Sequence, residues 1–323
     1  MFAMLAAAVV GALGLVGKYL EGSDYIGRRV AALEAIDNGE TVVTGASIAR
    51  HIELGALCLE GKNLWEPRQD IFEIVAFQRH LEDRGIVPSL WIIGYIPGFT
   101  TIDKGADAAR RADRRTVAYR TLQGAGDYRL IGGDWQGALR SIATPVLGYP
   151  EWRIRVKAAS AGRPFDTEQS ASDVAELDSE VLRQQSRRWR DTALAEQDRL
   201  KFHDDGIAGR AIDAIASLNV SLHRQGSQLV LVEMPVTAEL EAYGYGVTPE
   251  VVAREERLFE WLEAQGAAIV RLSDLPDQPR ARFRDFMHLT RSAGWAFSRE
   301  LGEELNERGL TERLACAAAR TGL

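Results

Sequence analysis

Cysteine is scarce in this 323-residue chain, which contains Cys58 and Cys316 and no others. Two cysteines do not make the set of bridges that holds small secreted domains together, and they do not supply the ligands of a structural zinc site. Cys58 lies in an apolar run and Cys316 lies near the end of the sequence, so we expect both to behave as small hydrophobic side chains. No histidine has a cysteine or a second histidine at metal-ligand spacing. We therefore predict no metal and no cofactor.

Long basic clusters are also missing. The formal net charge is −7 at pH 7, which argues against a nucleic-acid partner because such proteins concentrate Lys and Arg on one surface. Hydrophobic residues make up 46% of the chain, enough to bury a sizeable core. The length suits one large domain, or one domain with an elaboration.

Charged residues are absent from the first 17 positions, MFAMLAAAVVGALGLVG, and Lys18 ends this run. The run is about the minimum length for a membrane-spanning helix. It lacks the basic flank that precedes a removable signal sequence, and no small-residue cleavage pattern follows it. We predict a membrane anchor or signal segment at residues 1–20, with the anchor favoured, and a folded domain at residues 21–323. A buried helix is the alternative, because Ala and Gly make the run only moderately apolar.

Short apolar runs recur along the rest of the chain. Five of them predict strands, at residues 41–45, 56–60, 89–95, 228–234 and 267–272. Each run is nearly continuous and not alternating, which is typical of parallel strands buried on both faces. Helical patterns separate the strands, and several end at a glycine that suits a C-terminal cap. The alternation predicts a three-layer α/β/α fold of flavodoxin type with a five-stranded parallel sheet.

The connection between the third and fourth predicted strands is unusually long. Residues from about 100 to 210 are mostly polar and charged, and one stretch, DTEQSASDVAELDSEVLRQQSRRWRDTALAEQDRLK, has the character of an exposed helix. We interpret this connection as a helical insertion that caps the functional edge of the sheet. An excursion without a role at the site is the alternative.

Polar residues follow the predicted strands at the edge where an open parallel sheet binds its ligands. Ser47 follows the first strand, Gly61 and Asn63 follow the second, and Asp285 and His288 lie in the loop after the fifth. A serine hydroxyl needs an adjacent imidazole to take its proton and an acid to hold the imidazole in the correct tautomer. The sequence therefore predicts a catalytic Ser47–His288–Asp285 triad. Taken singly, Ser47 has the character of a helix N-cap, Asn63 of a turn residue, and Asp285 with His288 of a surface pair.

Two segments resemble motifs of the SGNH/GDSL hydrolase superfamily. TGASIARHI, which contains Ser47, is similar to the block with the nucleophile, and RDFMHLTRSAGW is similar to the block with Asp-x-x-His. QGSQLVLVEMPV resembles the penultimate strand of the membrane-associated branch, which includes teichoic acid D-alanyl transfer proteins and alginate-type O-acetyltransferases. The resemblance implies a flavodoxin-like sheet with Ser47 as nucleophile, His288 as base and Asp285 as orienting acid.

The same resemblance implies an oxyanion hole. Its donors would be the Ser47 amide, a backbone group near Gly61, and Asn63. The third block, which in the superfamily reads Gly-x-Asn-Asp, here reads IIGYIPGFT and contains neither Asn nor Asp. Another donor therefore has to replace that asparagine. Trp65, Tyr95 and Phe99 are candidates for stacking on sugar rings, with core packing as the alternative.

The resemblance leads to a functional expectation. We expect a membrane-anchored extracytoplasmic serine esterase or O-acyltransferase that acts on an O-acyl group of a carbohydrate or envelope polymer, with acetyl as the expected acyl group. The second hypothesis is a non-catalytic envelope protein that uses a cleft at this edge of the sheet for polymer binding or assembly. A cytoplasmic phosphate-binding α/β protein is the third, but no glycine-rich phosphate loop follows the first strand.

Overall fold

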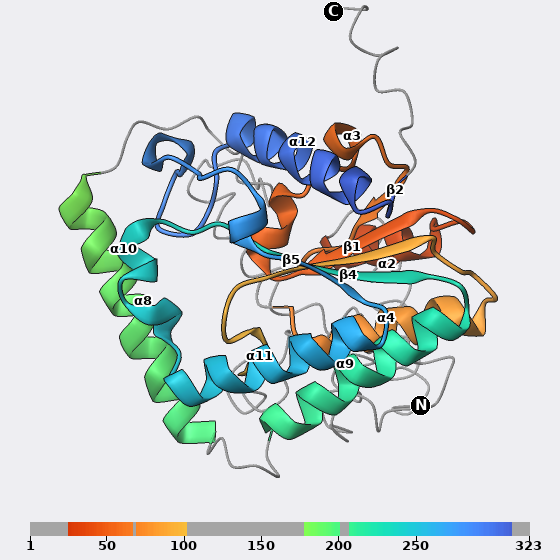
Figure 1. Ribbon diagram of the computed structural model, residues 1–323, viewed down its shortest axis with the longest axis horizontal. Helices are drawn as coiled ribbons and strands as arrows, with labels where there is room; N and C mark the ends of the chain where they lie inside the picture. The colour runs from red at the N-terminus through yellow and green to blue at the C-terminus, as the bar shows by residue number, and fades with distance from the viewer. Residues whose placement is uncertain (1–24, 67–68, 102–177, 201–206, 312–323) are drawn as a thin grey trace, which may run out of the picture. The chain divides into compact units, whose positions relative to one another are not determined.

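The computed structural model describes residues 25–66, 69–101, 178–200 and 207–311 (Figure 1). The predicted anchor, most of the predicted insertion, and Cys316 lie outside these residues. The chain divides into two compact units, of which the first contributes helix α2 (Tyr25–Glu34) to the described part. The second unit, Ile36–Asp103 with Ser172–Leu323, contains the sheet and every residue discussed below. Within the described ranges, no helix is both long enough and apolar enough to cross a bilayer.

The second unit is built on a five-stranded, entirely parallel sheet in the order β2-β1-β3-β4-β5. The strands are β1 (Thr41–Gly45), β2 (Gly61–Asn63), β3 (Leu90–Tyr95), β4 (Gln228–Glu233) and β5 (Ala268–Val270). This is the strand order of flavodoxin-like folds, in which ligands bind beyond the carboxyl ends of the strands. The predicted α/β fold class with a five-stranded parallel sheet is confirmed.

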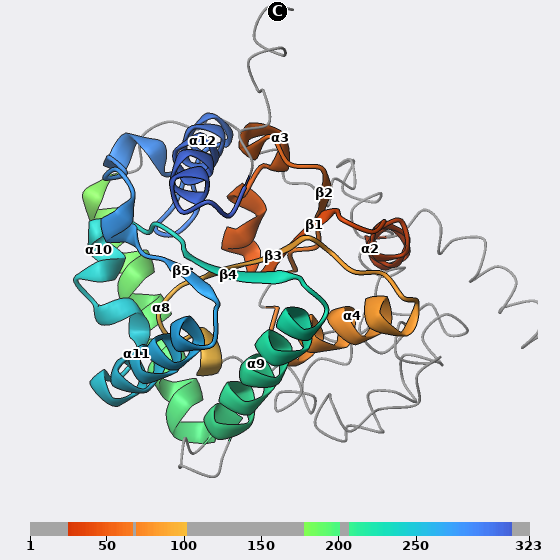
Figure 2. The ribbon, with the colours of Figure 1, turned by 45° about the vertical axis from the view of Figure 1, so that its right-hand side comes forward.

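Helices cover both faces of the sheet (Figures 1 and 2). One face carries α4 (Ile71–Asp83), α9 (Ile207–Arg224) and α11 (Pro249–Ala264), and the other carries α3 (Leu54–Leu57) and α12 (Arg291–Glu307). The continuous apolar strands are explained by this double cover, because every residue of β1 and β3 is buried. Thr44 is accommodated inside β1 because its hydroxyl accepts a hydrogen bond from the buried indole of Trp91 at 3.0 Å.

The second strand differs from the prediction. Residues 56–60 were expected to form it, but Ala56 and Leu57 belong to helix α3, and the strand is Gly61–Asn63. The apolar residues of this segment face α12, since an ideal Cβ on Gly302 would lie 3.4 Å from Leu57. Cys58 is disulfide-bonded, so the expectation that it is simply a small hydrophobe is wrong. The residues of this run are therefore apolar because they pack against a helix, not because they form a strand of the sheet.

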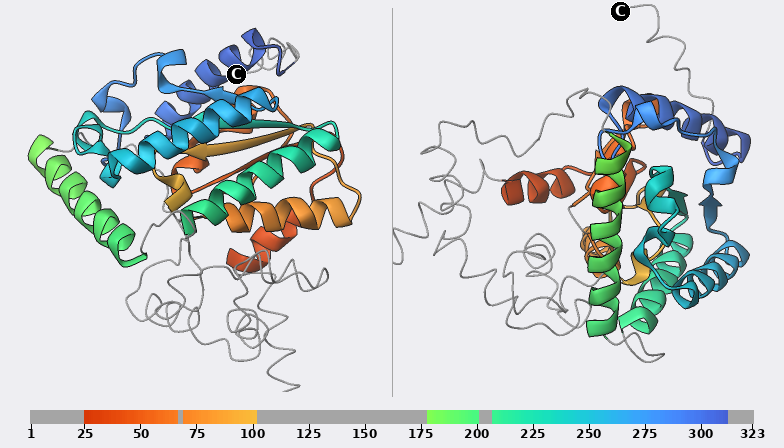
Figure 3. Two further views of the ribbon diagram at one scale, coloured as in Figure 1. Left: turned by 60° about the horizontal axis from the view of Figure 1, so that its bottom comes forward. Right: turned by 90° about the vertical axis from the view of Figure 1, so that its left-hand side faces the viewer.

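Helix α8 (Ser179–Leu200) runs beside the edge at which the strands end (Figure 3). Trp189 on α8 donates to the carbonyl of Tyr245 at 3.3 Å, and its ring lies 6.0 Å from that of Phe286. These contacts join α8 to α10 (Ala238–Glu241), to η4 (Gly244–Gly246) and to the loop after β5. This helix falls within the predicted insertion.

Candidate active site

Ser47 is presented by a tight turn at the end of β1. After Gly45 the chain enters the 3₁₀ helix η1 (Ser47–His51), and Ser47 is its first residue. Gly45 has φ +131°, and an ideal Cβ at this position would lie 2.3 Å from the carbonyl oxygen of Gly94 in β3. Only glycine fits this close approach of backbones. The backbone amide of Gly45 donates to the side chain of Gln69 at 2.6 Å, which fixes the turn.

Asp285 and His288 are presented by a closed loop. An antiparallel bridge joins Phe283 to Leu289, and the amide of Arg284 donates to the carbonyl of His288 at 2.9 Å. The Oδ1 atom of Asp285 accepts hydrogen bonds from the amides of Met287 at 3.0 Å and His288 at 2.8 Å. Aspartate often binds its own backbone two or three residues ahead. This local turn places the carboxylate beside the imidazole.

The two segments meet in one continuous line of hydrogen bonds, which runs from Ser47 through His288 to Asp285. Ser47 Oγ lies 2.8 Å from His288 Nε2, and His288 Nδ1 lies 2.9 and 3.0 Å from the two carboxylate oxygens of Asp285. A carboxylate only accepts, so His288 Nδ1 carries the proton and Nε2 presents its lone pair to the Ser47 hydroxyl. The His288 and Asp285 side chains are 16% and 27% exposed, so a ligand can reach the line from solvent.

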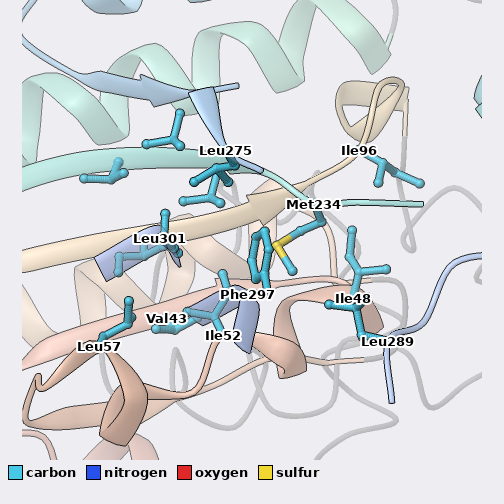
Figure 4. Close-up of a cluster of buried hydrophobic side chains, with 14 of the residues drawn as sticks. Val43, Ile48, Ile52, Leu57, Ile96, Met234, Leu275, Leu289, Phe297 and Leu301 are labelled. Atoms are coloured by element: carbon cyan, nitrogen blue, oxygen red, sulfur yellow. The ribbon is translucent and has the colours of Figure 1, made fainter. Parts of the chain in front are cut away.

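The hydrophobic core holds these distant segments together. Ile48 follows Ser47, while Met287 and Leu289 flank His288, and all three belong to one buried cluster with Phe297 of α12. Figure 4 shows Ile48, Leu289 and Phe297 in this cluster. Ile48 is 2% exposed and Leu289 is 1% exposed. Burying an aliphatic side chain of this size contributes about 1.5–3 kcal/mol. The alternation of buried and site-facing residues therefore makes core formation bring Ser47 and His288 into contact.

The charge of Asp285 is stabilised in its folded environment. Burial alone raises the pKa of Asp285, but the hydrogen bond and charge of His288 and the two backbone amides outweigh burial and hold the pKa at about 2. Hydrogen bonds to the ionised form have this effect on a carboxylate. Asp285 is therefore ionised throughout the neutral and mildly acidic range, as the tautomer of His288 requires.

Three further basic side chains surround this line. The imidazole of His51 is 4% exposed and its ring centroid lies 5.9 Å from that of His288. Arg50 Nε donates to His51 Nε2 at 3.2 Å, and Arg284 Nε lies 3.7 Å from an Asp285 carboxylate oxygen. Burial, followed by the charge of Arg50, lowers the pKa of His51 to about 2, so His51 is a neutral acceptor.

The residues expected to complete an oxyanion hole are not placed for that role. Gly61 pairs with Thr41 at the amino end of β1, on the opposite edge of the sheet from Ser47, so its assignment is wrong. It is required there because it has φ +149° and an ideal Cβ would lie 1.8 Å from the Thr41 carbonyl oxygen. Asn63 donates its amide hydrogens to the carbonyls of Ala49 at 2.9 Å and Ile52 at 3.0 Å. Asn63 therefore supports η1 and does not present these hydrogens to a substrate.

The three aromatic candidates separate into two groups. Tyr95 is 2% exposed and Phe99 is 9% exposed, and both pack against Phe259, with centroids 5.0 and 6.0 Å away. These two are core residues, so their assignment to substrate binding is wrong. Trp65 is half-buried, and the Arg50 guanidinium lies 5.9 Å from the centre of its ring. Trp65 is the one aromatic candidate that borders the site.

A buried carboxylate supports the loop after β3. Glu255 of α11 is 2% exposed and accepts hydrogen bonds from the amides of Gly98 at 2.7 Å and Thr100 at 2.9 Å, and from the Thr100 hydroxyl at 2.6 Å. Burial raises the pKa of Glu255 to about 7, although these hydrogen bonds act in the opposite direction. Glu255 holds the segment at which the long connection to β4 begins.

Sequence reasoning placed Ser47, Asp285 and His288 at one rim but missed the basic residues beside them. In a 3₁₀ helix, residues i and i+3 eclipse one another, so Ser47 and Arg50 share one side of η1. In the described part of the chain, no group of three or more His, Cys, Asp or Glu side chains is arranged to hold a metal.

No known protein-family model matches this chain, and no curated protein matches its sequence.

Proposed function

We propose that this protein is a serine esterase or O-acyltransferase of SGNH type. The observation that carries the proposal is the line from Ser47 Oγ to His288 Nε2 at 2.8 Å and from His288 Nδ1 to Asp285 at 2.9 Å. Nucleophile, base and orienting acid come from opposite ends of the chain and meet at the carboxyl edge of the sheet. A cap role for Ser47 is disfavoured, because its hydroxyl is directed to His288 and it follows the N-cap position, which Ala46 occupies.

The geometry supports a two-step mechanism. Ser47 Oγ attacks the ester carbonyl carbon while His288 Nε2 takes the hydroxyl proton. The tetrahedral intermediate collapses when the same proton passes from Nε2 to the leaving alcohol, which gives an acyl-enzyme. Water or an acceptor hydroxyl then attacks the acyl group, with His288 again as base. Asp285 accepts the Nδ1 proton throughout and stabilises the imidazolium form.

The oxyanion of the tetrahedral intermediate needs hydrogen-bond donors beside Ser47. The Ser47 amide, at the first position of η1, is the donor we assign, because the first N–H groups of a helix have no partner within it. Neither Gly61 nor Asn63 supplies a second donor in the arrangement described above. The missing second donor favours one alternative function, a non-catalytic envelope protein that binds its polymer at the same edge of the sheet.

The proposed setting is extracytoplasmic. The disulfide at Cys58 supports it, because such bonds persist in oxidising compartments. The uncharged segment at residues 1–17 is the proposed anchor. The proposed substrate, an O-acyl carbohydrate or envelope polymer, rests on the resemblance to SGNH proteins and on fold-level analogy.

Turnover of 4-nitrophenyl acetate by the wild type and by Ser47→Ala tests the proposal. We expect the substitution to reduce kcat by at least about 10³-fold, since removing a triad member eliminates the nucleophilic route. Ser227→Ala is the matched control, because Ser227 is buried and its hydroxyl has no hydrogen-bond partner in the described part of the chain. A folded wild type without turnover would favour the binding protein, and cell fractionation tests the location.

A further inference from the structure

Two arginines flank the proposed triad without a complete set of hydrogen-bond partners. Arg50 lies one 3₁₀ turn after Ser47, and Arg284 immediately precedes Asp285. Within the described part of the chain, Arg50 Nη2 and Arg284 Nε are buried and have no hydrogen-bond partner. Arg284 Nε is 3.7 Å from Asp285, which is close enough for charge attraction but too far for a hydrogen bond. A buried guanidinium hydrogen without an acceptor costs free energy, so these groups need an explanation.

Arg50 is held in place by neighbours that cannot neutralise it. Its Nε donates to His51, and its guanidinium faces the Trp65 ring. His51 is itself confined, because an ideal Cβ on Gly294 would lie 3.4 Å from its Nδ1 atom. A neutral imidazole and an aromatic ring fix the direction of the guanidinium but leave its charge uncompensated.

The two guanidinium groups repel one another. Burial and then the charge of Arg284 lower the pKa of Arg50 to about 10, while Asp285 acts in the opposite direction. Asp285 is already committed to His288 and to two backbone amides. The cluster of Arg50, Arg284 and Asp285 therefore carries one positive charge more than negative charge at neutral pH, next to the reacting hydroxyl.

We infer that Arg50 and Arg284 bind a carboxylate of the ester substrate and so select an anionic ester over a neutral one. This inference rests on the proposed esterase or acyltransferase function. Guanidinium groups match the two oxygens of a carboxylate through paired N–H donors. A carboxylate bound against the accessible parts of the two guanidinium groups offsets their repulsion and supplies the negative charge that the cluster lacks. Both side chains can be reached from solvent, because Arg284 is 14% exposed and Arg50 is half-buried. The bound carboxylate then orients the acyl group toward Ser47.

Two pairs of esters test this selection. The first pair is 4-acetoxybenzoate and its methyl ester, which place the charge on the alcohol side. The second is 4-nitrophenyl hydrogen succinate and its methyl ester, which place it on the acyl side. The ratio of kcat/KM for the anionic ester to that for the neutral ester is compared between variants, which cancels differences in intrinsic reactivity.

We expect Arg50→Gln and Arg284→Gln each to lower this ratio by about 10- to 150-fold for at least one pair, the range for losing a hydrogen bond to a charged group. Taking the ratio removes any loss of turnover that is common to the anionic and the neutral ester. Arg50→Lys and Arg284→Lys, which keep the charge, should retain part of the selection. Arg224→Gln is the matched control. Arg224 lies on α9 and pairs with Glu82 of α4, on the face of the sheet opposite to α3 and α12. Circular dichroism of each variant verifies that it is folded.

A wild type that hydrolyses both pairs, with ratios unchanged in both arginine variants, would overturn the inference while leaving the proposed function intact. If no ester is hydrolysed, the proposed function fails, and calorimetric titration of the same esters into the wild type decides the inference separately. Binding of the anionic ester at least tenfold tighter than its methyl ester, with loss in Arg50→Gln, supports it. Equal affinities overturn it.

Discussion

Replacing Asp285 with Asn removes one negative charge while keeping the shape of the side chain. Two consequences follow from the contacts of Asp285. An amide nitrogen facing His288 Nδ1 forces the proton to the other ring nitrogen, so that Nε2 no longer presents a lone pair to Ser47. The variant also loses the stabilisation that ionised Asp285 gains from His288 and from the amides of Met287 and His288.

The pKa of Asp285 gives the magnitude of the effect on stability, and the known cost of a wrong imidazole tautomer gives that of the effect on activity. Lowering the Asp285 pKa from 3.8 to about 2 corresponds to roughly 2 kcal/mol of folding free energy, at about 1.4 kcal/mol for each pKa unit. Because the folded pKa is depressed, this stabilisation is present above pH 3.8 and is lost as the pH falls through 2. For activity, a wrong imidazole tautomer costs about 10⁴-fold in kcat in the serine protease on which the triad was defined.

Two assays measure these effects. Urea unfolding at pH 6 should show Asp285→Asn less stable than wild type by about 2 kcal/mol, with the difference shrinking toward pH 2.5. Turnover of 4-nitrophenyl acetate should fall by about 10³- to 10⁴-fold without a comparable change in KM. A variant within tenfold of wild-type kcat, or one whose stability deficit does not depend on pH, would refute the assigned role of Asp285.

Two other predictions concern groups away from the nucleophile. Burial raises the pKa of Glu255 from 4.5 to about 7, so the folded state binds a proton more tightly than the unfolded state and wild-type stability falls as the pH rises between these values. Glu255→Gln lacks this dependence. In denaturant titrations, the free energy of unfolding of the variant should rise relative to that of wild type by up to about 3 kcal/mol between pH 4.5 and 7.5. A difference between the two proteins that does not change with pH would contradict the pKa assignment. Because Cys58 is disulfide-bonded, alkylation of the unfolded protein before reduction should leave Cys58 unmodified, and alkylation after reduction should modify it. Modification of Cys58 before reduction would contradict the bond.

The sequence predicted the sheet well where strands are buried on both faces. β1 is bounded as expected, and β3, β4 and β5 differ from the expected ranges only at their ends, because the sequences of these parallel strands are mostly apolar. The prediction of β2 was wrong for the opposite reason. Gly61–Asn63 is a three-residue, half-buried edge strand with no apolar signal, while the apolar residues before it pack on α12.

The rim position of Ser47, Asp285 and His288 could be predicted because parallel strands end at one edge. The neighbours of these residues could not be predicted in the same way. The position of Arg50 depends on whether η1 turns by three or by 3.6 residues, and sequence does not distinguish these for a five-residue helix. The role of Gly61 depended on a strand boundary misplaced by a few residues, which moved it to the opposite edge of the sheet.

Labelling by a fluorophosphonate probe tests the central claim, that His288 activates the Ser47 hydroxyl. The probe reacts with serines whose proton an adjacent base can accept. We predict one phosphonylated peptide, containing Ser47, in mass spectra of the native protein, and no labelling in Ser47→Ala, in His288→Ala, or after heat denaturation. Native, monodisperse protein that remains unlabelled, or that is labelled at a different serine, would contradict the account.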